Sequence, residues 1–514
     1  MKNTMNPVRM VAAAVALAIA SGLANAGEPQ SYTPTPDSLV NYEVPEWYQD
    51  AKFGVWAHWG VYSVPEYRGW HAAEWYPRHM YSRKDNENNF FKYHSERYGD
   101  PAEFGYKDLI PHFTAEKFNP DEWMDLAVEA GAKFYTVVSI HHDGFAMFDS
   151  KHTRWNAVDM GPKRDITGEL LSAARERGLK TGISNHFAFN LDYYKMNHQE
   201  GGDVTPETYD LYGHGKGVDE WYLKRWWDIT TELVDTYQPD LYYFDWGWNK
   251  WPEFEQPRKD FLAYFYNKSI EFGKGSFGQP GVVMTYKNRH KLPLGSAVVD
   301  MERGRFNSIQ PMTWQADTSV SMHSWGFADN DQYWPTNELV DMLVDIVSKN
   351  GVVMLNFGPR ADGSISEEYV SRLREMGGWL KQNGEAIYNT RPFHLYGEGP
   401  TIATAENQRE LNHKGYNYTA EDIRFTRSKD WKTVYAIALD WPGDSQILTI
   451  TSLKKGAFDL SELTSITMPG VEGELSYEQT ERGLEVTMPN HKPTEHAHPI
   501  ALHFAQSVEQ AQVK

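Results

Sequence analysis

The feature of this chain that most limits its possible folds is an alternation of short apolar runs with amphipathic helical segments. Apolar runs of strand length recur over about 350 residues, and helix patterns lie between several of them. The predicted strands are Phe53–Trp59, Phe134–Ile140, Lys180–Asn185, Leu241–Phe244, Val282–Tyr286, Ala297–Met301 and Val352–Phe357. The alternation predicts an α/β fold, and its length favours a (β/α)8-type TIM barrel over an open sheet.

Local signals place helices between these strands. Asn119 is a predicted N-cap, Pro120 stands at the first helical position, and Glu122 completes a capping box. Similar start and stop signals predict helices over 169–177 and 219–237. No glycine-rich dinucleotide fingerprint follows the first strand, which weakens the alternative of a Rossmann fold.

The pattern changes after Pro392, where glycine and proline turns separate short β-like runs. The runs are Asp422–Arg427, Thr433–Leu439, Gln446–Thr451, Leu484–Met488 and Ile500–Phe504. They predict a small antiparallel β-sandwich. We therefore expect a signal peptide over 1–26, a catalytic barrel over 27–392, a β-sandwich over 393–508 and a tail over 509–514.

The N-terminal segment is typical of a secretory signal. Lys2 and Arg9 form a basic start, and the apolar run after them is too short to span a bilayer. Ala24-Asn25-Ala26 resembles a cleavage site, whereas an uncleaved membrane anchor would need a longer apolar run. We expect a secreted or periplasmic protein that has no membrane span once the signal is removed.

Charge and composition narrow the possible partners. The formal charge is −20, from 50 basic and 70 acidic side chains, and such a surface repels nucleic acid and anionic lipid. It also argues mildly against a polyanionic polymer as ligand, unless the site has its own basic patch. The chain has no cysteine, so the fold relies on core packing without disulfides. The oligomeric state stays open.

One predicted strand ends in an acidic residue. The apolar run Leu241–Phe244 leads directly into Asp245, and Trp246-Gly247-Trp248 follows. Burying an unpaired charge is costly, and the carboxyl ends of barrel strands are where catalytic residues lie. The catalytic interpretation of Asp245 competes with a structural one, in which its side chain caps the next helix.

Other polar clusters follow predicted strands or lie in long loops. They are His58-Trp59-Gly60, Glu74-Trp75-Tyr76, His141-His142-Asp143-Gly144-Phe145, Asn185-His186 and Glu302-Arg303-Gly304-Arg305. Neutral imidazoles both donate and accept hydrogen bonds, which suits sugar hydroxyls. Taken alone, His58 is typical of a packed strand histidine and Glu74 of a solvated surface acid. Because these clusters contain neither His-x-His nor His-Glu-x-x-His, and no cysteine exists, we predict no metal and no cofactor.

Glu302 also has a structural alternative. Arg303 and Arg305 follow it, and a salt bridge to either would hold the carboxylate ionised, which is wrong for a proton donor. A proton-donor role needs desolvation by nearby Trp and Tyr side chains. Two carboxylates on separate strands of one barrel, with aromatic and histidine neighbours, are nevertheless what glycoside hydrolysis requires.

Together these motifs resemble one family, the α-L-fucosidases of glycoside hydrolase family 29. The segments that carry the resemblance are WYQDAKFGVWAHWGVYSVPEY, HAAEWYPRHMY, GAKFYTVVSIHHDGFAMFDSKHTRWNAVD, KRDITGELLSAARERGLKTGISNH, PDLYYFDWGW, DMERG, MTWQADTSVSMHSWGF, LVDIVSKNGVVMLNFGPRADGSI and WLKQNGEAIYNTRPF. They cover roughly residues 45–395, and the predicted sandwich also fits the layout of the family.

The resemblance implies roles for matching residues. Asp245 matches the nucleophile, and Glu302 is the best match to the acid/base. The residues that match fucose-binding positions are His58, Glu74, Trp75, His141, His142 and Arg289. His186 is predicted to replace a tyrosine that contacts fucose, and Tyr243 stands where a tryptophan is frequent. These two departures put the aglycone and substrate preference in question, but not the reaction type.

The resemblance therefore implies a secreted, exo-acting, retaining α-L-fucosidase that acts on fucosylated oligosaccharides or polysaccharides. Trp75, Trp246 and Trp248 are expected to exclude water and to pack against the C6 methyl of fucose. The nearest alternative is the same fold acting on α-L-galactosides or sulfated fucan oligosaccharides. A non-catalytic carbohydrate-binding protein and a metal-dependent barrel hydrolase are more distant alternatives.

Overall fold

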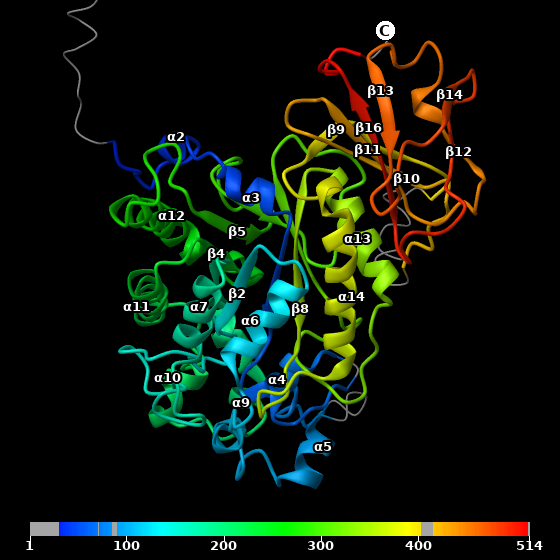
Figure 1. Ribbon diagram of the computed structural model, residues 1–514. Helices are drawn as coiled ribbons and strands as arrows, with labels where there is room; N and C mark the ends of the chain where they lie inside the picture. The colour runs from blue at the N-terminus through cyan, green and yellow to red at the C-terminus, as the bar shows by residue number, and fades with distance from the viewer. Residues whose placement is uncertain (1–29, 70, 85–89, 402–414, 512–514) are drawn as a thin grey trace, which may run out of the picture.

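Eight parallel strands close into a barrel in chain order in the computed structural model, which describes residues 30–69, 71–84, 90–401 and 415–511 (Figure 1). The strands are β1 (Phe53–Ala57), β2 (Phe134–Ile140), β3 (Lys180–Asn185), β4 (Leu241–Phe244), β5 (Val283–Lys287), β6 (Val298–Asp300), β7 (Trp314–Ser319) and β8 (Gly351–Phe357). This confirms the predicted TIM barrel. The predicted signal peptide lies outside the described residues.

The sequence pattern does not predict β7, although the strand is completely buried. Its polar side chains have partners inside the barrel. Tyr48 donates to Gln315 Oε1 at 2.7 Å, and Gln315 Nε2 donates to Asp300 Oδ1 at 2.8 Å. A buried polar strand lacks the apolar run by which the other barrel strands are recognised.

Helices cover the outside of the barrel (Figure 1). The long ones are α6 (Pro120–Glu129), α7 (Ile166–Glu176), α11 (Glu220–Tyr237), α12 (Glu255–Glu271), α13 (Thr336–Ser348) and α14 (Glu367–Asn383). The side chain of Asn119 accepts a hydrogen bond from the Asp121 amide, which confirms the predicted N-cap of α6. In the ranges that the structure describes, no helix is both long and apolar enough to cross a membrane.

The connections between strands are uneven. Residues 288–297 and 301–313, all of them described, join β5 to β6 and β6 to β7 without a helix. Short helices lie before β1 and in the long connections after β1 and β3. They are α2 (Pro36–Leu39), α3 (Glu46–Ala51), α4 (Tyr76–His79), α5 (Phe90–Arg97), α8 (Asn190–Tyr193), α9 (Lys195–Gln199) and α10 (Tyr209–Tyr212). Long connections of this kind supply the walls of a barrel active site.

A second domain follows the barrel. Its five-stranded sheet has the order β13-β16-β11-β10-β9, and its three-stranded sheet has the order β12-β15-β14. The strands are β9 (Arg391–Glu398), β10 (Ile423–Arg427), β11 (Thr433–Ala438), β12 (Ile447–Ile450), β13 (Leu463–Thr467), β14 (Tyr477–Gln479), β15 (Leu484–Thr487) and β16 (His498–Phe504). Side chains of both sheets share one core, which confirms the predicted antiparallel β-sandwich. The strands that the sequence misses, β9, β13 and β14, all lie at sheet edges, where half-exposed positions weaken the apolar pattern.

Buried contacts fix the sandwich against α13 and α14 (Figure 1). Arg424 of β10 donates to Asp345 of α13 at 2.6 Å, and Lys349 lies 2.7 Å from the same carboxylate. Trp379 of α14 donates to the carbonyl of Ala497 at 2.8 Å. The sandwich therefore packs on the side of the barrel, away from the strand ends described next.

Candidate active site

A cavity lies at the carboxyl ends of the barrel strands. The residues that line it are Trp56, His58, Glu74, Trp75, His141, His142, His186, Tyr243, Asp245, Trp246, Lys287, Glu302, Asp317 and Trp325. The cavity therefore brings together every site residue predicted from the sequence except Arg289. All of its lining comes from the barrel domain.

Arg289 is placed outside this cavity. It is exposed in the turn after β5, next to Asn288, whose φ is +71°. Lys287, the last residue of β5, lines the cavity instead. The side chain of Trp248 also lies elsewhere, because it is buried against Phe244 with ring centroids 4.2 Å apart. Of the three tryptophans expected to wall the pocket, Trp75 and Trp246 do so.

Asp245 makes three polar side-chain contacts in the cavity. Its Oδ1 lies 2.9 Å from Lys287 Nζ, and its Oδ2 lies 3.1 Å from His142 Nε2 and 3.5 Å from His186 Nδ1. Asp245 precedes the short 3-10 helix Trp246–Asn249, but its side chain makes no capping hydrogen bond. The structural alternative for this residue is therefore not realised.

The charge state of Asp245 follows from these contacts. Burial by itself raises the pKa of the carboxyl, but the Lys287 ammonium and the hydrogen bonds from His142 and His186 outweigh that effect. The pKa of Asp245 consequently lies well below its usual range. An ionised carboxylate at the end of a barrel strand is suited to act as a nucleophile.

Glu302 shares the ammonium of Lys287. Its Oε2 lies 2.6 Å from Lys287 Nζ, and its side chain is 38% exposed, so the expected desolvation by Trp and Tyr does not occur. In the described part of the chain neither following arginine forms a salt bridge with it, although the charge of the buried Arg303 acts on it. Arg303 donates to the carbonyls of Ser321 and Met322, and Arg305 lies against Asp345. Because Asp245 Oδ1 and Glu302 Oε2 lie 2.9 and 2.6 Å from one nitrogen, no more than 5.5 Å separates them.

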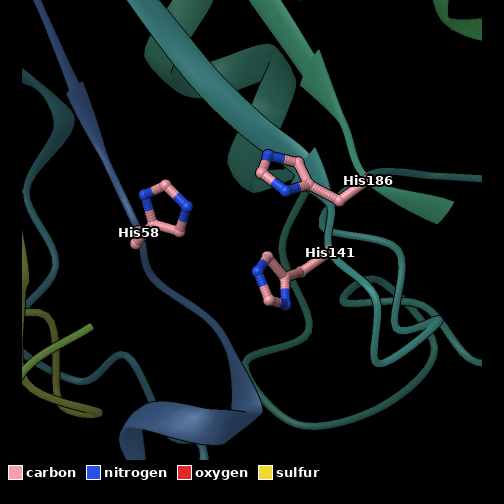
Figure 2. A group of neighbouring side chains, drawn as sticks. All are labelled: His58, His141 and His186. Atoms are coloured by element: carbon pink, nitrogen blue, oxygen red, sulfur yellow. The ribbon is translucent and has the colours of Figure 1, made fainter. Parts of the chain in front are cut away.

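Three histidines from neighbouring strands converge on the cavity (Figure 2). His58, His141 and His186 follow β1, β2 and β3. Burial lowers the pKa of His186 to about 4 and the pKa values of His58 and His141 well below their usual range. All three rings are therefore neutral at pH 7 and can both donate and accept hydrogen bonds.

The tautomer of His58 is set by Asn356. The amide nitrogen of Asn356 donates to Ser319 Oγ at 3.0 Å and to the Trp325 carbonyl at 2.7 Å. Its Oδ1 therefore faces His58 Nδ1, 2.8 Å away, as an acceptor. The proton of His58 consequently lies on Nδ1, and Nε2 keeps its lone pair for a ligand.

Convergence of the strands also makes a cation site geometrically possible. The potential ligand atoms of His58, His141 and His186 lie within 4.8 Å of one another, as do those of His142, His186 and Asp245. The prediction of no metal rested on local spacing, which does not register residues brought together from separate strands. Neutral imidazole nitrogens suit zinc, and the same nitrogens suit sugar hydroxyls.

Glu74 is a buried cavity residue, so its interpretation as a solvated surface acid is wrong. Its Oε2 accepts hydrogen bonds from the amides of Trp325 at 3.0 Å and Gly326 at 3.1 Å. Its Oε1 is buried without a partner among the described residues, so this oxygen is available to a ligand. Burial raises the pKa of Glu74 to about 7, although the amide contacts lower it.

Replacing Glu74 by glutamine is expected to flatten the pH dependence of stability. The pKa of about 7 in the fold exceeds the ordinary 4.5, so protonation favours the folded state. That contribution is complete below the unfolded pKa and is lost as the pH rises through 7. Between pH 4.5 and 8, the wild-type free energy of unfolding should fall by about 3 kcal/mol more than that of Glu74→Gln. Urea unfolding at both pH values measures this difference, and parallel pH dependences would contradict it.

Aromatic faces form the remaining walls. Trp75 and Trp246 lie nearly parallel, with ring centroids 6.5 Å apart and an angle of 11° between the planes. Trp325 packs on His58 with centroids 5.2 Å apart. At the base, Trp56 and Tyr243 are both fully buried. The cavity thus combines apolar faces with convergent polar groups, as carbohydrate sites require.

Sequence reasoning missed four lining residues, Trp56, Lys287, Asp317 and Trp325, while Tyr243 was noted only as a departure from the family pattern. Lys287 lies one position beyond the predicted end of its strand, so the rule that strand ends carry function could have found it. Asp317 lies on β7, which has no apolar signal. Trp325 belongs to the quoted segment MTWQADTSVSMHSWGF, but nothing local to the sequence assigns it a role.

Sequence comparisons agree with this arrangement. A family profile described as α-L-fucosidase matches residues 19–385, and one described as α-L-fucosidase C-terminal domain matches residues 417–505. Tissue α-L-fucosidase from Rattus norvegicus is 32% identical over 496 residues, which cover 93% of each chain. Plasma α-L-fucosidase from Homo sapiens is 31% identical over 436 residues, covering 81% of this chain and 80% of that one.

Structural comparison gives the same result. The crystal structure of Thermotoga maritima α-fucosidase in complex with fucose superimposes with a TM-score of 0.71. The two chains are 28% identical, and the alignment covers 92% of this chain and 100% of the other. Both the barrel and the region after it are therefore similar to proteins of one family.

Proposed function

Since this chain belongs to the α-L-fucosidase family and is a glycoside hydrolase, we propose that it is a secreted, exo-acting enzyme that removes terminal α-L-fucose from fucosylated glycans with retention of configuration. The family supports the sugar and the bond. Three parts of the proposal go beyond family membership: retention of configuration, action at the end of the glycan, and secretion.

Retention rests on the spacing of the two carboxylates. Retaining glycosidases hold their two carboxyl groups roughly 5–5.5 Å apart, whereas inverting enzymes leave roughly 6.5–9.5 Å for a water molecule. The upper limit of 5.5 Å between Asp245 Oδ1 and Glu302 Oε2 agrees with the first arrangement. This spacing is the single observation that carries the proposed mechanism.

Each carboxyl group then has a defined task. Asp245 attacks the anomeric carbon while the bond to the leaving oxygen breaks, and the proton of Glu302 passes to that oxygen. Water next attacks the anomeric carbon of the glycosyl-enzyme and gives a proton to Glu302, and Asp245 leaves as a carboxylate. The low pKa of Asp245 supports the nucleophilic task.

The walls of the cavity support recognition of one terminal sugar. Trp56 and Tyr243 close its base, so a glycan enters by its end. The neutral imidazoles of His58 and His141 and the free oxygen of Glu74 suit ring hydroxyls. The indole wall formed by Trp75 and Trp246 suits the C6 methyl of fucose. α-L-Galactose carries a hydroxymethyl group at this position.

Secretion rests on the N-terminal sequence, where a basic start, a short apolar run and Ala24-Asn25-Ala26 have the order of a signal peptide.

The proposal is tested by following the products of hydrolysis by proton NMR. With 4-nitrophenyl α-L-fucoside we expect turnover in which α-L-fucose appears first and the β-anomer forms only by later mutarotation. The matching α-L-galactoside should react more slowly, because its additional hydroxyl must be desolvated against the indole wall. Initial release of β-L-fucose would overturn retention, and faster turnover of the galactoside would overturn the assigned sugar.

A further inference from the structure

Lys287 occupies the centre of the candidate active site. Its Nζ lies 2.9 Å from Asp245, 2.6 Å from Glu302 and 3.5 Å from Asp317. The side chain is only 11% exposed, so the ammonium has given up most of its water for three carboxyl groups. Neither the predicted roles nor the family resemblance assigns this residue a function.

Asp317 is the third carboxyl group around Lys287. Its Oδ2 accepts a hydrogen bond from Tyr243 at 2.9 Å. Burial and the charge of Asp317 together raise the pKa of the neighbouring Asp300 well above its usual range, and the two side chains are hydrogen-bonded.

The two catalytic carboxyl groups differ in their contacts. Asp245 receives three polar contacts and is buried. Among the described residues the ion pair of Glu302 is with Lys287, its side chain is more exposed, and the charge of the buried Arg303 acts on it as well. The retaining mechanism proposed above assigns the transferable proton to Glu302, and the contacts of Lys287 with both carboxyl groups place the ammonium where charge moves during that transfer.

We propose that Lys287 is a catalytic residue whose ammonium contacts both catalytic carboxyl groups and stabilises whichever of them is ionised as the reaction proceeds. In the first step the Asp245 oxygen bonds to the anomeric carbon, the leaving oxygen departs with the proton of Glu302, and Asp245 becomes a neutral ester. Glu302 is now ionised and stays in contact with the ammonium, so one ionised catalytic carboxylate faces Lys287 before and after this step. In the second step water supplies a hydroxyl to the anomeric carbon and a proton to Glu302, and Asp245 regains its charge.

This inference rests on the proposed retaining mechanism. Its test uses the full chain with Lys287→Met, a substitution that removes the charge but keeps a side chain of similar length. The acid limb of kcat/KM should move to higher pH by about 1–3 units, because Asp245 loses its nearest cation. Hydrolysis of the glycosyl-enzyme should slow by roughly 10²-fold or more. Azide, an anionic nucleophile that needs no base, should restore turnover of a dinitrophenyl fucoside.

Two further variants separate the charge from the packing. Lys287→Arg keeps the charge and should retain the wild-type acid limb. Asp317→Asn removes a negative charge near the same ammonium, and the basic limb should therefore move to lower pH. Lys250→Met serves as the control, since Lys250 pairs with Asp192 at 2.6 Å and touches neither catalytic carboxylate.

Unchanged pH limbs in both Lys287→Met and Asp317→Asn would overturn the proposal. The proposal would also be overturned if azide did not restore the activity lost in Lys287→Met and the Lys287→Arg variant were equally inactive. These outcomes are distinct from failure of the proposed function, which would appear as absent or inverting turnover in the wild type. Circular dichroism and thermal melting show whether each variant is folded. If Lys287→Met does not fold, the basic limb of Asp317→Asn still tests the proposal.

Discussion

Replacing Asp245 by alanine is expected to lower kcat/KM for an aryl α-L-fucoside by about 10⁴–10⁶-fold, the range that loss of a member of a covalent catalytic unit costs elsewhere. The reason is that the ester to the sugar can no longer form. Because alanine also vacates the face opposite the leaving group, azide should attack there and yield the inverted β-fucosyl azide. Nitrophenol release and NMR of the azide product measure both effects.

The control for this experiment is a partly exposed carboxylate on the next helix, outside the cavity. Asp260 of α12 accepts a hydrogen bond from Gln256 on the protein surface. Its replacement by alanine should leave kcat/KM unchanged. If Asp245→Ala retained more than about a tenth of wild-type turnover, the nucleophile would be another residue. Loss of the nucleophile of a covalent mechanism costs far more than tenfold.

Replacing Glu302 by glutamine is expected to have an effect that depends on the leaving group. General acid catalysis contributes about 10²–10⁴-fold, so the glycosylation rate for a poor leaving group such as an alcohol should fall by that amount. A dinitrophenolate leaves without a proton, so its glycosylation should change little and the glycosyl-enzyme should accumulate. Pre-steady-state release of the phenol and mass spectrometry of the intact protein follow both steps.

Azide also distinguishes Glu302 from Asp245. In Glu302→Gln it attacks the glycosyl-enzyme and should give the α-fucosyl azide, the opposite anomer from Asp245→Ala. Glu271→Gln, an exposed change at the end of α12, is the matched control. If alcohol and dinitrophenol leaving groups suffer equally, or if both variants give the same azide anomer, Glu302 is not the acid/base.

Much of the fold could be predicted because its signals are local. The apolar run of Phe134–Ile140 and the Asn119 cap are each decided within a few residues, and the barrel follows from their alternation. Strand β7 could not be predicted, because Gln315 and Asp317 are buried only by virtue of partners far along the chain. A polar strand of this kind is stable once the barrel closes around it.

The cavity brings together most of the residues predicted for the site, but the environments of two of them differ from what local sequence indicates. Glu74 seemed exposed and is buried, because residues from the loop 324–326 donate to it across the cavity. The structural alternative for Glu302 is a salt bridge to Arg303 or Arg305, and its ion pair is instead with Lys287. The partners of both glutamates are distant in sequence, and composition and spacing carry no information about them.

The sequence by itself determined which residues could react: a carboxylate at the end of the strand Leu241–Phe244, a glutamate in DMERG, and histidines after the first three strands. Periodicity and strand ends are properties of neighbouring residues, so these features needed no coordinates. Only the tertiary structure decided how they react. It set Asp245 and Glu302 on one ammonium, at most 5.5 Å apart, and it supplied Asp317 beneath them. Protonation depends on the summed charge and burial around each group, and that sum exists only after the eight strands have closed.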